Sequence, residues 1–321
     1  MKRLNIVLFM IFLMCGFGIS GQNTLNAQDN LPVPPGELID IGGYQLHIYC
    51  IGEGSPTVIL ETGSGVLSLS WHPLQEQIAE FTRVCTYDRA GYGWSDSGPT
   101  PRTALQVTSE LEMLLTNAGV ETPIILAGHS MGGMFVRYFA ATHPSLVAGV
   151  VLVDATPPTW STIRAEIPEF DTVFQGEAAG YDQLISVVRA GRWTAQDARR
   201  TISPELPTEL VETYAQLMSQ PTVIEAIYAE YVAFNYNLEQ TRAAGSLGDI
   251  PLIVLAASNA PIPEEWADRA WERWVDLQEE QALISTNSHF EVLDSGHYIY
   301  VELPDVVLEA VRELVESTSS E

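Results

Sequence analysis

The sequence predicts an α/β protein with a mostly parallel central sheet and an inserted all-helical cap. Short apolar runs alternate with amphipathic segments from residue 57 to residue 154, and the alternation resumes at residue 251. Between these parts, residues 156–248 carry helical patterns and no convincing strand. Apolar strands that alternate with helices indicate a parallel sheet covered on both faces. We therefore expect a core built from residues 32–154 and 250–318, with a helical cap formed by residues 155–249.

The composition limits the classes of function. The chain has 321 residues, of which 46% are apolar, so a large buried core is possible. Its 41 acidic and 15 basic residues give a net charge of −26, which disfavours nucleic acid and anionic membranes as partners. Lys2 is the only lysine, so the body of the chain has no lysine for Schiff-base chemistry or a phosphate-binding loop.

The N-terminus has the pattern of a secretory signal. Lys2 and Arg3 precede an apolar stretch that runs to about Ile19, and small and polar residues follow. We assign residues 1–27 to a signal peptide and expect cleavage between residues 20 and 27. An uncleaved membrane anchor is the alternative, because the apolar stretch is short for a spanning helix but not too short. Either interpretation predicts a secreted, periplasmic or extracellular protein.

The first part of the core begins with a predicted hairpin. Leu38–Ile41 and Tyr44–Cys50 flank Gly42 and Gly43, a two-residue turn pair. Apolar runs then predict strands at residues 57–60, 83–87, 124–127 and 149–153. Helical spacing predicts helices at residues 71–81, 103–118 and 131–142. In the helix over 103–118, the leucines assigned to the buried side are Leu105, Leu111, Leu114 and Leu115.

The second part of the core repeats the strand–helix alternation. It predicts strands at residues 251–255 and 290–293 and helices at residues 264–283 and 304–316. The cap before it is rich in aromatic residues, most of which fit the cap's own core at helical spacing. A few of them are expected to line an apolar pocket. These aromatic residues are Trp160, Phe170, Phe174, Tyr181, Trp193, Tyr214, Tyr228, Tyr231, Phe234 and Tyr236.

A serine lies in a tight turn between the predicted strand over 124–127 and the helix over 131–142. Gly128-His129-Ser130-Met131-Gly132 fits the pattern G-x-S-x-G, the nucleophile elbow, in which the glycines make room for a sharp turn and the serine hydroxyl stands clear of the sheet. The helix that follows has a dipole that favours negative charge at the serine. We predict that Ser130 is a catalytic nucleophile rather than part of a packing turn.

A serine needs a base to remove its proton. Of the six histidines, His297 lies in a loop after the last predicted strand, Asp294-Ser295-Gly296-His297-Tyr298. A loop at the carboxyl edge of a sheet can reach a serine at the same edge. His129 is inside the elbow and should point away from Ser130, and His143 fits a cationic helix cap. His297 is therefore the predicted general base.

These motifs together resemble an α/β-hydrolase-fold serine hydrolase, esterase-like and with a helical cap. The matching segments are Thr62–Gly65, Tyr87–Gly93, the Ser130 elbow and Ser295–His297, and the resemblance covers nearly all of the chain after the signal segment. A serine at the elbow argues against relatives that carry aspartate there, such as haloalkane dehalogenases and epoxide hydrolases. The resemblance implies hydrolysis by acyl transfer to the serine, without a metal or an organic cofactor.

The resemblance also implies an oxyanion hole made of two backbone N–H groups. One belongs to the residue after the nucleophile, Met131. The other belongs to the loop after an early strand, where relatives often read His-Gly and this chain reads Thr62-Gly63. The matching donor is Ser64, or Gly65 if the register slips by one residue. The alternative is a glycine turn without a catalytic role.

The third member of the triad departs from the family pattern. Relatives usually carry an aspartate in the loop after the penultimate strand, and that slot holds Asn259 here, which bears no charge. Asp154 follows the strand after the elbow helix, a position that some members of the fold use for the acid. We assign the acid to Asp154, with a structural turn residue as the alternative. Glu264 and Glu265 are fallback candidates, although acidic residues are also common at a helix start.

Two further pairs have expected roles. The resemblance implies that the second hairpin strand neighbours the strand with Cys85, so Cys50 and Cys85 are predicted to form a disulfide in an oxidising compartment. Two buried free thiols are the alternative. Asp88 and Arg89 are interpreted as a structural turn that holds an ion pair.

The predicted function is an exported serine hydrolase that cleaves carboxylic esters of small to medium apolar substrates through an acyl-enzyme on Ser130. The expected partner is a small-molecule ester, with no nucleic acid and no membrane beyond a possible N-terminal anchor. One alternative is a non-hydrolytic ligand-binding protein, which the missing charge at Asn259 supports. A peptidase or lactonase with the same triad is the other.

Overall fold

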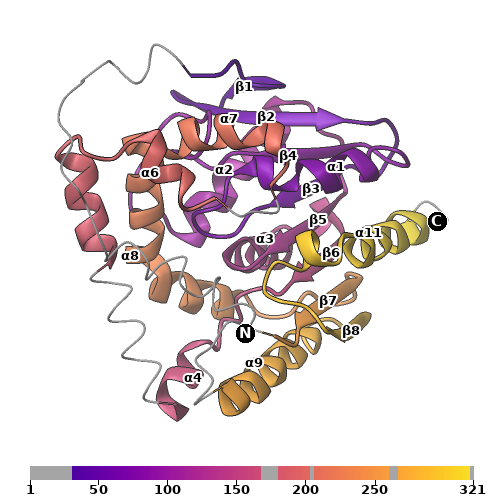
Figure 1. Ribbon diagram of the computed structural model, residues 1–321. Helices are drawn as coiled ribbons and strands as arrows, with labels where there is room; N and C mark the ends of the chain where they lie inside the picture. The colour runs from indigo at the N-terminus through magenta and orange to yellow at the C-terminus, as the bar shows by residue number, and fades with distance from the viewer. Residues whose placement is uncertain (1–30, 168–179, 203–205, 260–266, 319–321) are drawn as a thin grey trace.

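The computed structural model describes residues 31–167, 180–202, 206–259 and 267–318. Its centre is an eight-stranded sheet with the order β1-β2-β4-β3-β5-β6-β7-β8 (Figure 1). β1 pairs antiparallel with β2 and β2 with β4, and the remaining pairs are parallel. The strands are β1 Glu37–Asp40, β2 Gln45–Ile51, β3 Val58–Glu61, β4 Val84–Tyr87, β5 Ile124–His129, β6 Val147–Val153, β7 Leu252–Ala257 and β8 Ser288–Leu293.

Helices cover both faces of the sheet, as the apolar runs predict. One face packs against α2 Ala104–Asn117, α3 Met131–Thr142 and α9 Ala267–Ala282. The other packs against α1 His72–Ile78, α10 Ile299–Glu302 and α11 Pro304–Thr318. Neighbouring residues of β5 alternate between the two clusters, with Leu126 in the first and Ile125 and Ala127 in the second, because successive side chains of a strand point to opposite faces. Two short 3-10 helices complete the core, η4 Ser68–Trp71 and η5 Pro144–Leu146.

The described residues of the insertion between β6 and β7 form helices joined by turns and loops, with no strand among them. It contains α4 Ser161–Glu166, α6 Ala195–Arg199, α7 Thr208–Met218 and α8 Pro221–Ala244, and residues 180–189 are helical as well. Most of its buried residues form a cluster of their own that includes Trp193, Tyr214 and Ile224 and that also packs on Leu67 and Tyr92 of the core. α4 lies apart from this cluster, beside α9 (Figure 1).

The assignment of Leu105 to the buried side of its helix is wrong. Its side chain is 53% exposed on α2, whereas Leu111, Leu114 and Leu115 are buried as expected. At about 100° per residue, Leu105 lies outside the stripe that these three leucines share with Ala104. Its backbone N–H donates to the side-chain oxygen of Gln240 on α8, and its side chain faces solvent.

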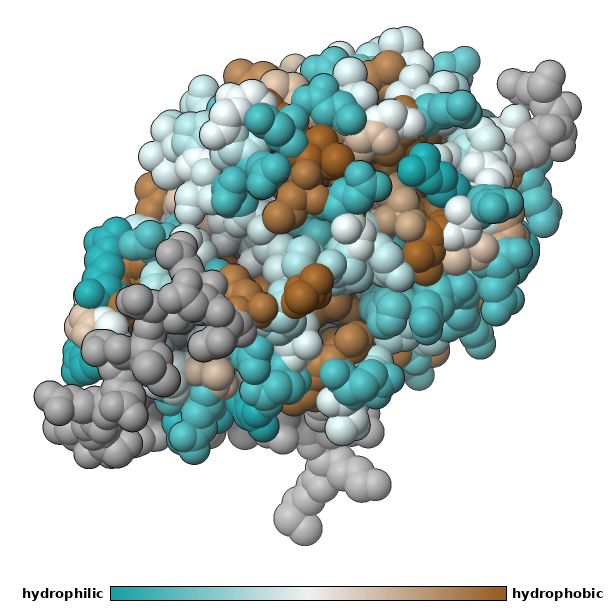
Figure 2. Space-filling model, turned by 90° about the horizontal axis from the view of Figure 1, so that it is seen from above, coloured by the Kyte–Doolittle hydropathy of each residue, from teal (hydrophilic) through white to brown (hydrophobic). Residues whose placement is uncertain are grey.

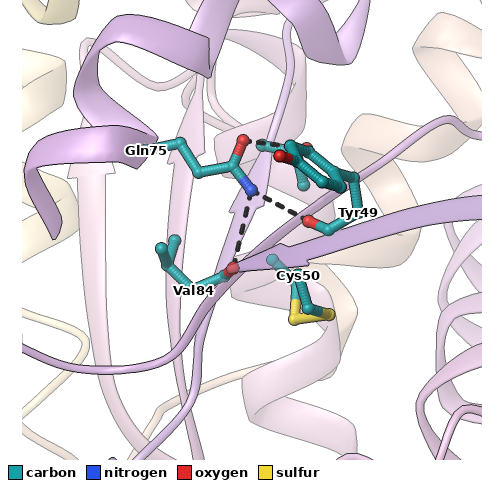
Figure 3. The surroundings of a disulfide bond; sticks show 6 residues. Tyr49, Cys50, Gln75 and Val84 are labelled. Carbon is teal, nitrogen blue, oxygen red and sulfur yellow. Dashed lines mark hydrogen bonds between the residues drawn. A yellow bond between two sulfur atoms is a disulfide. The ribbon is translucent and has the colours of Figure 1, made fainter. Parts of the chain in front are cut away.

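A disulfide joins β2 to β4, as predicted for Cys50 and Cys85. Cys50 is the direct partner of Cys85 in the antiparallel pair, and their sulfur atoms are bonded. Beside the disulfide, the side-chain amide of Gln75 donates to the carbonyls of Tyr49 and Val84, so α1 also bridges the two strands (Figure 3). Closing a loop of 35 residues stabilises the folded state by about 3–4 kcal/mol in the chain-entropy model.

The expected ion pair between Asp88 and Arg89 is wrong, because the two neighbours belong to separate networks. Asp88 accepts a hydrogen bond from Nδ1 of His47 at 2.9 Å, and the other ring nitrogen of His47 donates to the Pro35 carbonyl. Burial lowers the pKa of His47, but the hydrogen bond and charge of Asp88 and the Pro35 carbonyl outweigh burial and raise it. Arg89 instead pairs with Glu61 and Glu230. Consecutive side chains that leave a strand end in opposite directions explain the separation.

Hydrophilic residues cover much of the surface. In the space-filling view from above, hydrophobic residues lie in small patches between hydrophilic ones (Figure 2). This distribution agrees with the acidic composition and its net charge of −26. Across the described ranges, no helix has both the length and the apolar character needed to cross a membrane.

Candidate active site

Ser130 occupies a strained turn between β5 and α3. Its φ of 54° lies in the left-handed region, which side chains other than glycine rarely adopt. The turn is held by its own backbone: Ser130 N–H donates to the Val153 carbonyl at 3.2 Å, and Thr156 N–H donates to the Ser130 carbonyl at 2.8 Å. Val153 and Thr156, which come before and after Asp154 in the chain, therefore hold the Ser130 backbone in place. The strained conformation persists because these two hydrogen bonds, to β6 and to the segment after it, fix the backbone of Ser130.

The glycines of the elbow are required by close approach. A Cβ at Gly128 would lie 2.8 Å from the Gly132 carbonyl oxygen, and one at Gly132 would lie 2.4 Å from the Thr62 carbonyl oxygen. A Cβ at Gly133 would meet that of Ala155 at 2.2 Å. Any side chain at these positions would force the backbone apart, which explains why the motif extends to a third glycine.

The loop after β3 lies directly against the serine. A Cβ on Gly63 would be 3.1 Å from the Cβ of Ser130, so this glycine leaves room beside the hydroxyl. Gly65 N–H already donates to the Tyr92 hydroxyl at 3.2 Å, which disfavours it as an oxyanion donor. Ser64 therefore remains the candidate from this loop. Met131, the other candidate, is the first residue of α3 and lies where the helix dipole favours negative charge.

Asp154 and His297 meet across the site. Nδ1 of His297 donates to Oδ2 of Asp154 at 2.5 Å. The imidazole is 26% exposed, whereas the carboxylate is 1% exposed. One ring nitrogen of His297 is thus held by the buried Asp154 carboxylate, and the ring itself is partly exposed. A general base requires both features.

Three donors converge on the Asp154 carboxylate. Besides His297, the backbone N–H of Ala257 donates to Oδ1 at 3.0 Å, and the indole Nε1–H of Trp274 donates to Oδ1 at 2.8 Å. The aspartate itself has a positive φ of 42°. A fully buried carboxylate is tolerated when its lone pairs are occupied in this way. Its strained backbone and complete set of partners are typical of a functional position rather than a simple turn.

The remaining positions considered for the acid are Asn259, Glu264 and Glu265. Asn259 fills the slot where relatives carry aspartate, but its side chain is exposed and donates to Asp294 at 2.5 Å. Its backbone N–H donates to the Ser295 carbonyl at 2.9 Å, so the loop after β7 supports the histidine loop through its backbone. Glu264 and Glu265 lie outside the described residues.

His129 has a role that the sequence did not predict. Its ring lies 4.5 Å from that of His297, and its Nε2–H donates to the His297 backbone carbonyl at 2.9 Å. Burial, together with the charge of His297, lowers the pKa of His129 well below its ordinary value, so the ring is neutral. The side chain does leave Ser130, as expected, but it holds the histidine loop. Its position inside the elbow motif was the only available signal.

A buried charge cluster lies on the β3 side of β5, whereas Asp154 lies on the β6 side. Arg89 donates to Glu61 at 2.5 Å and to Glu230 of α8 at 2.7 Å, and all three side chains are at most 1% exposed. Arg89 also donates to the carbonyls of Thr62 and Gly63 in the loop after β3. Burial, with a contribution from the charge of Glu230, raises the pKa of Glu61, although Arg89 opposes the shift. The cluster therefore ties α8 of the insertion to the candidate oxyanion loop. The sequence did not predict Glu61 or Glu230.

Known proteins share both the sequence pattern and the architecture. A "Probable transporter" of Hormonema carpetanum, efuK, is 32% identical over 170 residues, which are 49% of this chain and 24% of its own length. The uncharacterized protein YqjL of Bacillus subtilis is 26% identical over 264 residues, 82% of this chain and 85% of its own. The chain thus spans about a quarter of the first relative and most of the second.

Solved structures have the same fold at low identity. Potato (Solanum tuberosum) epoxide hydrolase I aligns with a TM-score of 0.64 at 18% identity, covering 88% of this chain and 98% of its own. A thermophilic esterase from Thermogutta terrifontis aligns with a TM-score of 0.59 at 22% identity, covering 86% and 94%. The enol-lactonase from Burkholderia xenovorans LB400 has a TM-score of 0.59 at 19% identity, covering 85% and 97%.

The family assignment depends on a match longer than any of the local motifs. The model of the alpha/beta hydrolase fold matches residues 56–304, which include β3, the elbow, the whole insertion and the His297 loop. The order of the strands and the position of the serine turn agree with this match. The chain therefore belongs to the alpha/beta hydrolase fold family.

Proposed function

We propose that the chain is a serine hydrolase that cleaves carboxylic esters of small to medium apolar substrates through an acyl-enzyme on Ser130. The observation that carries this proposal is the 2.5 Å hydrogen bond between His297 and the buried Asp154, beside the strained turn that holds Ser130. A hydroxyl, a charged acid and a base in this order along the chain are the components of a serine triad.

The proposed mechanism assigns one task to each group. His297 removes the Ser130 proton as the oxygen attacks the substrate carbonyl, and it then protonates the leaving alcohol. Asp154 holds the imidazole in the tautomer with Nδ1–H and stabilises its cationic form. The N–H groups of Ser64 and Met131 stabilise the oxyanion, a contribution of several kcal/mol. Water activated by His297 then releases the acid.

A ligand-binding protein without activity is the main alternative, and the charge arrangement argues against it. Burying a carboxylate completely is costly unless donors compensate it, and a receptor would gain nothing from pairing it with a partly exposed histidine. Asp154 is 0% exposed and supplies the charge that Asn259 lacks. This arrangement supports the hydrolase over the binding alternative.

The substrate class is proposed from the surroundings of the site. Tyr298 and Tyr300 follow His297, and their rings lie 5.2 and 5.0 Å from that of His129. Met131 contributes to a cluster with Phe135 and Leu238 that Trp160 and Phe234 of the insertion also contact. Aromatic and aliphatic groups around a serine favour apolar acyl or alcohol groups. Export remains part of the proposal, and N-terminal sequencing of the mature protein would test cleavage between residues 20 and 27.

A covalent probe tests the nucleophile. Wild type should react stoichiometrically with an organophosphonate, Ser130→Ala should not react, and His297→Ala should react slowly while remaining folded. Labelling that survives Ser130→Ala would refute the assignment. An ester panel of increasing acyl length, with matched amides and lactones, then distinguishes an esterase from a peptidase or a lactonase. The absence of both labelling and turnover in wild type would favour the binding protein.

A further inference from the structure

The helix after the expected acid loop presents three hydrogen-bond donors to the segment that carries Asp154. Trp274, Gln278 and Gln281 of α9 follow one another at intervals of four and three residues, so they lie on one face of the helix. All three are buried, at 7%, 0% and 2% exposure. The buried face of a core helix is normally apolar, and two buried glutamines on it require an explanation.

Each donor is directed at Asp154 or at the residue after it. Trp274 Nε1–H donates to Asp154 Oδ1 at 2.8 Å. The side-chain amides of Gln278 and Gln281 donate to the Ala155 carbonyl at 2.8 and 3.0 Å. The helix therefore binds both the carboxylate and the backbone beside it.

The indole ring is itself fixed. Trp274 packs with Ile163, Ile167 and Leu277, and its ring lies 5.2 Å from that of Trp160 with an interplanar angle of 87°. Its ring centroid is 6.4 Å from that of His297. Because Trp274 bonds one carboxylate oxygen and His297 the other, the position of the indole determines which oxygen faces the base.

We propose that Trp274 is a positioning residue for the acid at Asp154, with Gln278 and Gln281 holding the adjacent backbone. This inference rests on the proposed serine hydrolase function. The acid lies one strand away from the slot that Asn259 occupies, and α9 supplies the support for that location. Trp274 acts on the base through the carboxylate, to which its indole N–H donates.

The pH dependence of activity distinguishes positioning from packing. The Asp154–His297 pair has one negative charge when the imidazole is neutral and none when it is protonated. A donor to the carboxylate stabilises the more negative state, so loss of the indole N–H should favour the protonated imidazole. The acid limb of the kcat profile should then move to higher pH.

The other titratable groups around His297 do not interfere with this readout. Burial raises the pKa of Tyr298 to about 12 and raises that of Tyr300 further above its ordinary value. Burial lowers the pKa of His129 well below its ordinary value. Glu302 accepts a hydrogen bond from the Gly296 N–H at 2.9 Å and is unchanged in the variants below.

The test compares Trp274→Phe with Trp193→Phe. Both substitutions keep an aromatic ring and remove a buried indole donor, but Trp193 donates to the Met218 carbonyl in the cap at 3.0 Å and is 9% exposed. Trp274→Phe should lower kcat by roughly tenfold with little change in KM, and the midpoint of the acid limb should rise by about 0.5–1 pH unit. Trp193→Phe should leave the midpoint unchanged.

The outcomes separate this inference from the proposed function. An active wild type with an unchanged acid limb in Trp274→Phe overturns the positioning role and leaves the hydrolase intact. An equal shift of the midpoint in both variants also overturns it, because loss of packing would then suffice. If wild type neither labels at Ser130 nor turns over esters, the proposed function itself fails. Should Trp274→Phe fold poorly, Gln278→Leu is the second variant, with the same expected fall in kcat.

Discussion

Glu61 and Asp154 are buried carboxylates at the carboxyl ends of β3 and β6, the two strands that flank β5 and its serine. Glu61 faces Arg89, a permanent cation that is 1% exposed. Asp154 faces His297, a titratable group that is 26% exposed. The same kind of side chain at matching positions therefore has different uses, and the partner decides which. A buried cation gives a structural cluster, whereas a partly exposed histidine gives a candidate base.

The two halves of the sheet extend this contrast. The disulfide, the His47–Asp88 pair and the Glu61–Arg89 pair all lie on β2, β3 or β4 or in the loops that follow them, and Glu230 joins Arg89 from α8. The three candidate triad residues lie at the ends of β5, β6 and β8. Substitutions in the first half should therefore change stability, and substitutions in the second half should change turnover.

The largest expected effect is that of Asp154→Asn. The asparagine keeps the shape of the side chain but removes the charge and favours the wrong imidazole tautomer, so kcat for ester hydrolysis should fall on the order of 10³–10⁴-fold. The melting temperature should change little by comparison. Steady-state kinetics would check the loss, and retention of more than about a tenth of the wild-type kcat would make Asp154 a structural residue.

Arg89→Met should have the next largest effect, and on stability rather than on chemistry. It leaves the buried carboxylates of Glu61 and Glu230 without their cation, which should cost about 3–5 kcal/mol of unfolding free energy. Chemical denaturation measures the loss. Arg200→Met is the control, because its exposed pair with Asp197 should contribute less than about 1 kcal/mol. Equal losses in the two variants would contradict the structural role of the cluster.

A smaller effect with a pH signature is expected at His47. Its raised folded-state pKa gives stability that is fully present below its unfolded value near 6.5 and is lost as pH rises through the folded value. The lowered pKa of Asp88 gives stability that is lost only as pH falls below about 4. His47→Asn should therefore cost about 1–3 kcal/mol near pH 5 and less near pH 9. The exposed His289→Asn should show no such dependence, and a loss at His47 that does not vary with pH would contradict an ionised pair.

The smallest effect is expected where relatives carry the acid. Asn259→Asp in the Asp154→Asn background should restore kcat by less than about threefold, since the side chain at 259 is exposed and bonded to Asp294. Kinetics of the single and double variants measure the rescue. Recovery by two orders of magnitude would show that the loop after β7 can still deliver an acid, and the contrast between the two strand ends would weaken.

The sequence predicted the strands, the serine elbow and the histidine loop, because each of them has a local pattern. It also allowed Asp154 and His297 to be paired, and the structure places them 2.5 Å apart. It assigned the acid to Asp154 but kept Glu264 and Glu265 as fallback candidates, because the choice depends on side-chain directions. The Arg89–Glu230 bond spans 141 residues and the Trp274–Asp154 bond spans 120, so no local pattern encodes either. The Asp88–Arg89 prediction failed because adjacency in sequence does not place side chains on one side of a strand end.

The start of the insertion has a consequence for protein engineering. Asp154, Ala155 and Thr156 are bonded to His297, α9 and Ser130, so the first residues of the predicted cap belong to the core. A chimera that exchanges the insertion for that of another hydrolase should therefore be joined after Thr156. The graft should also keep a carboxylate in place of Glu230, because Arg89 would otherwise lose a buried partner. Under these two conditions, substrate preference could be transplanted as a module.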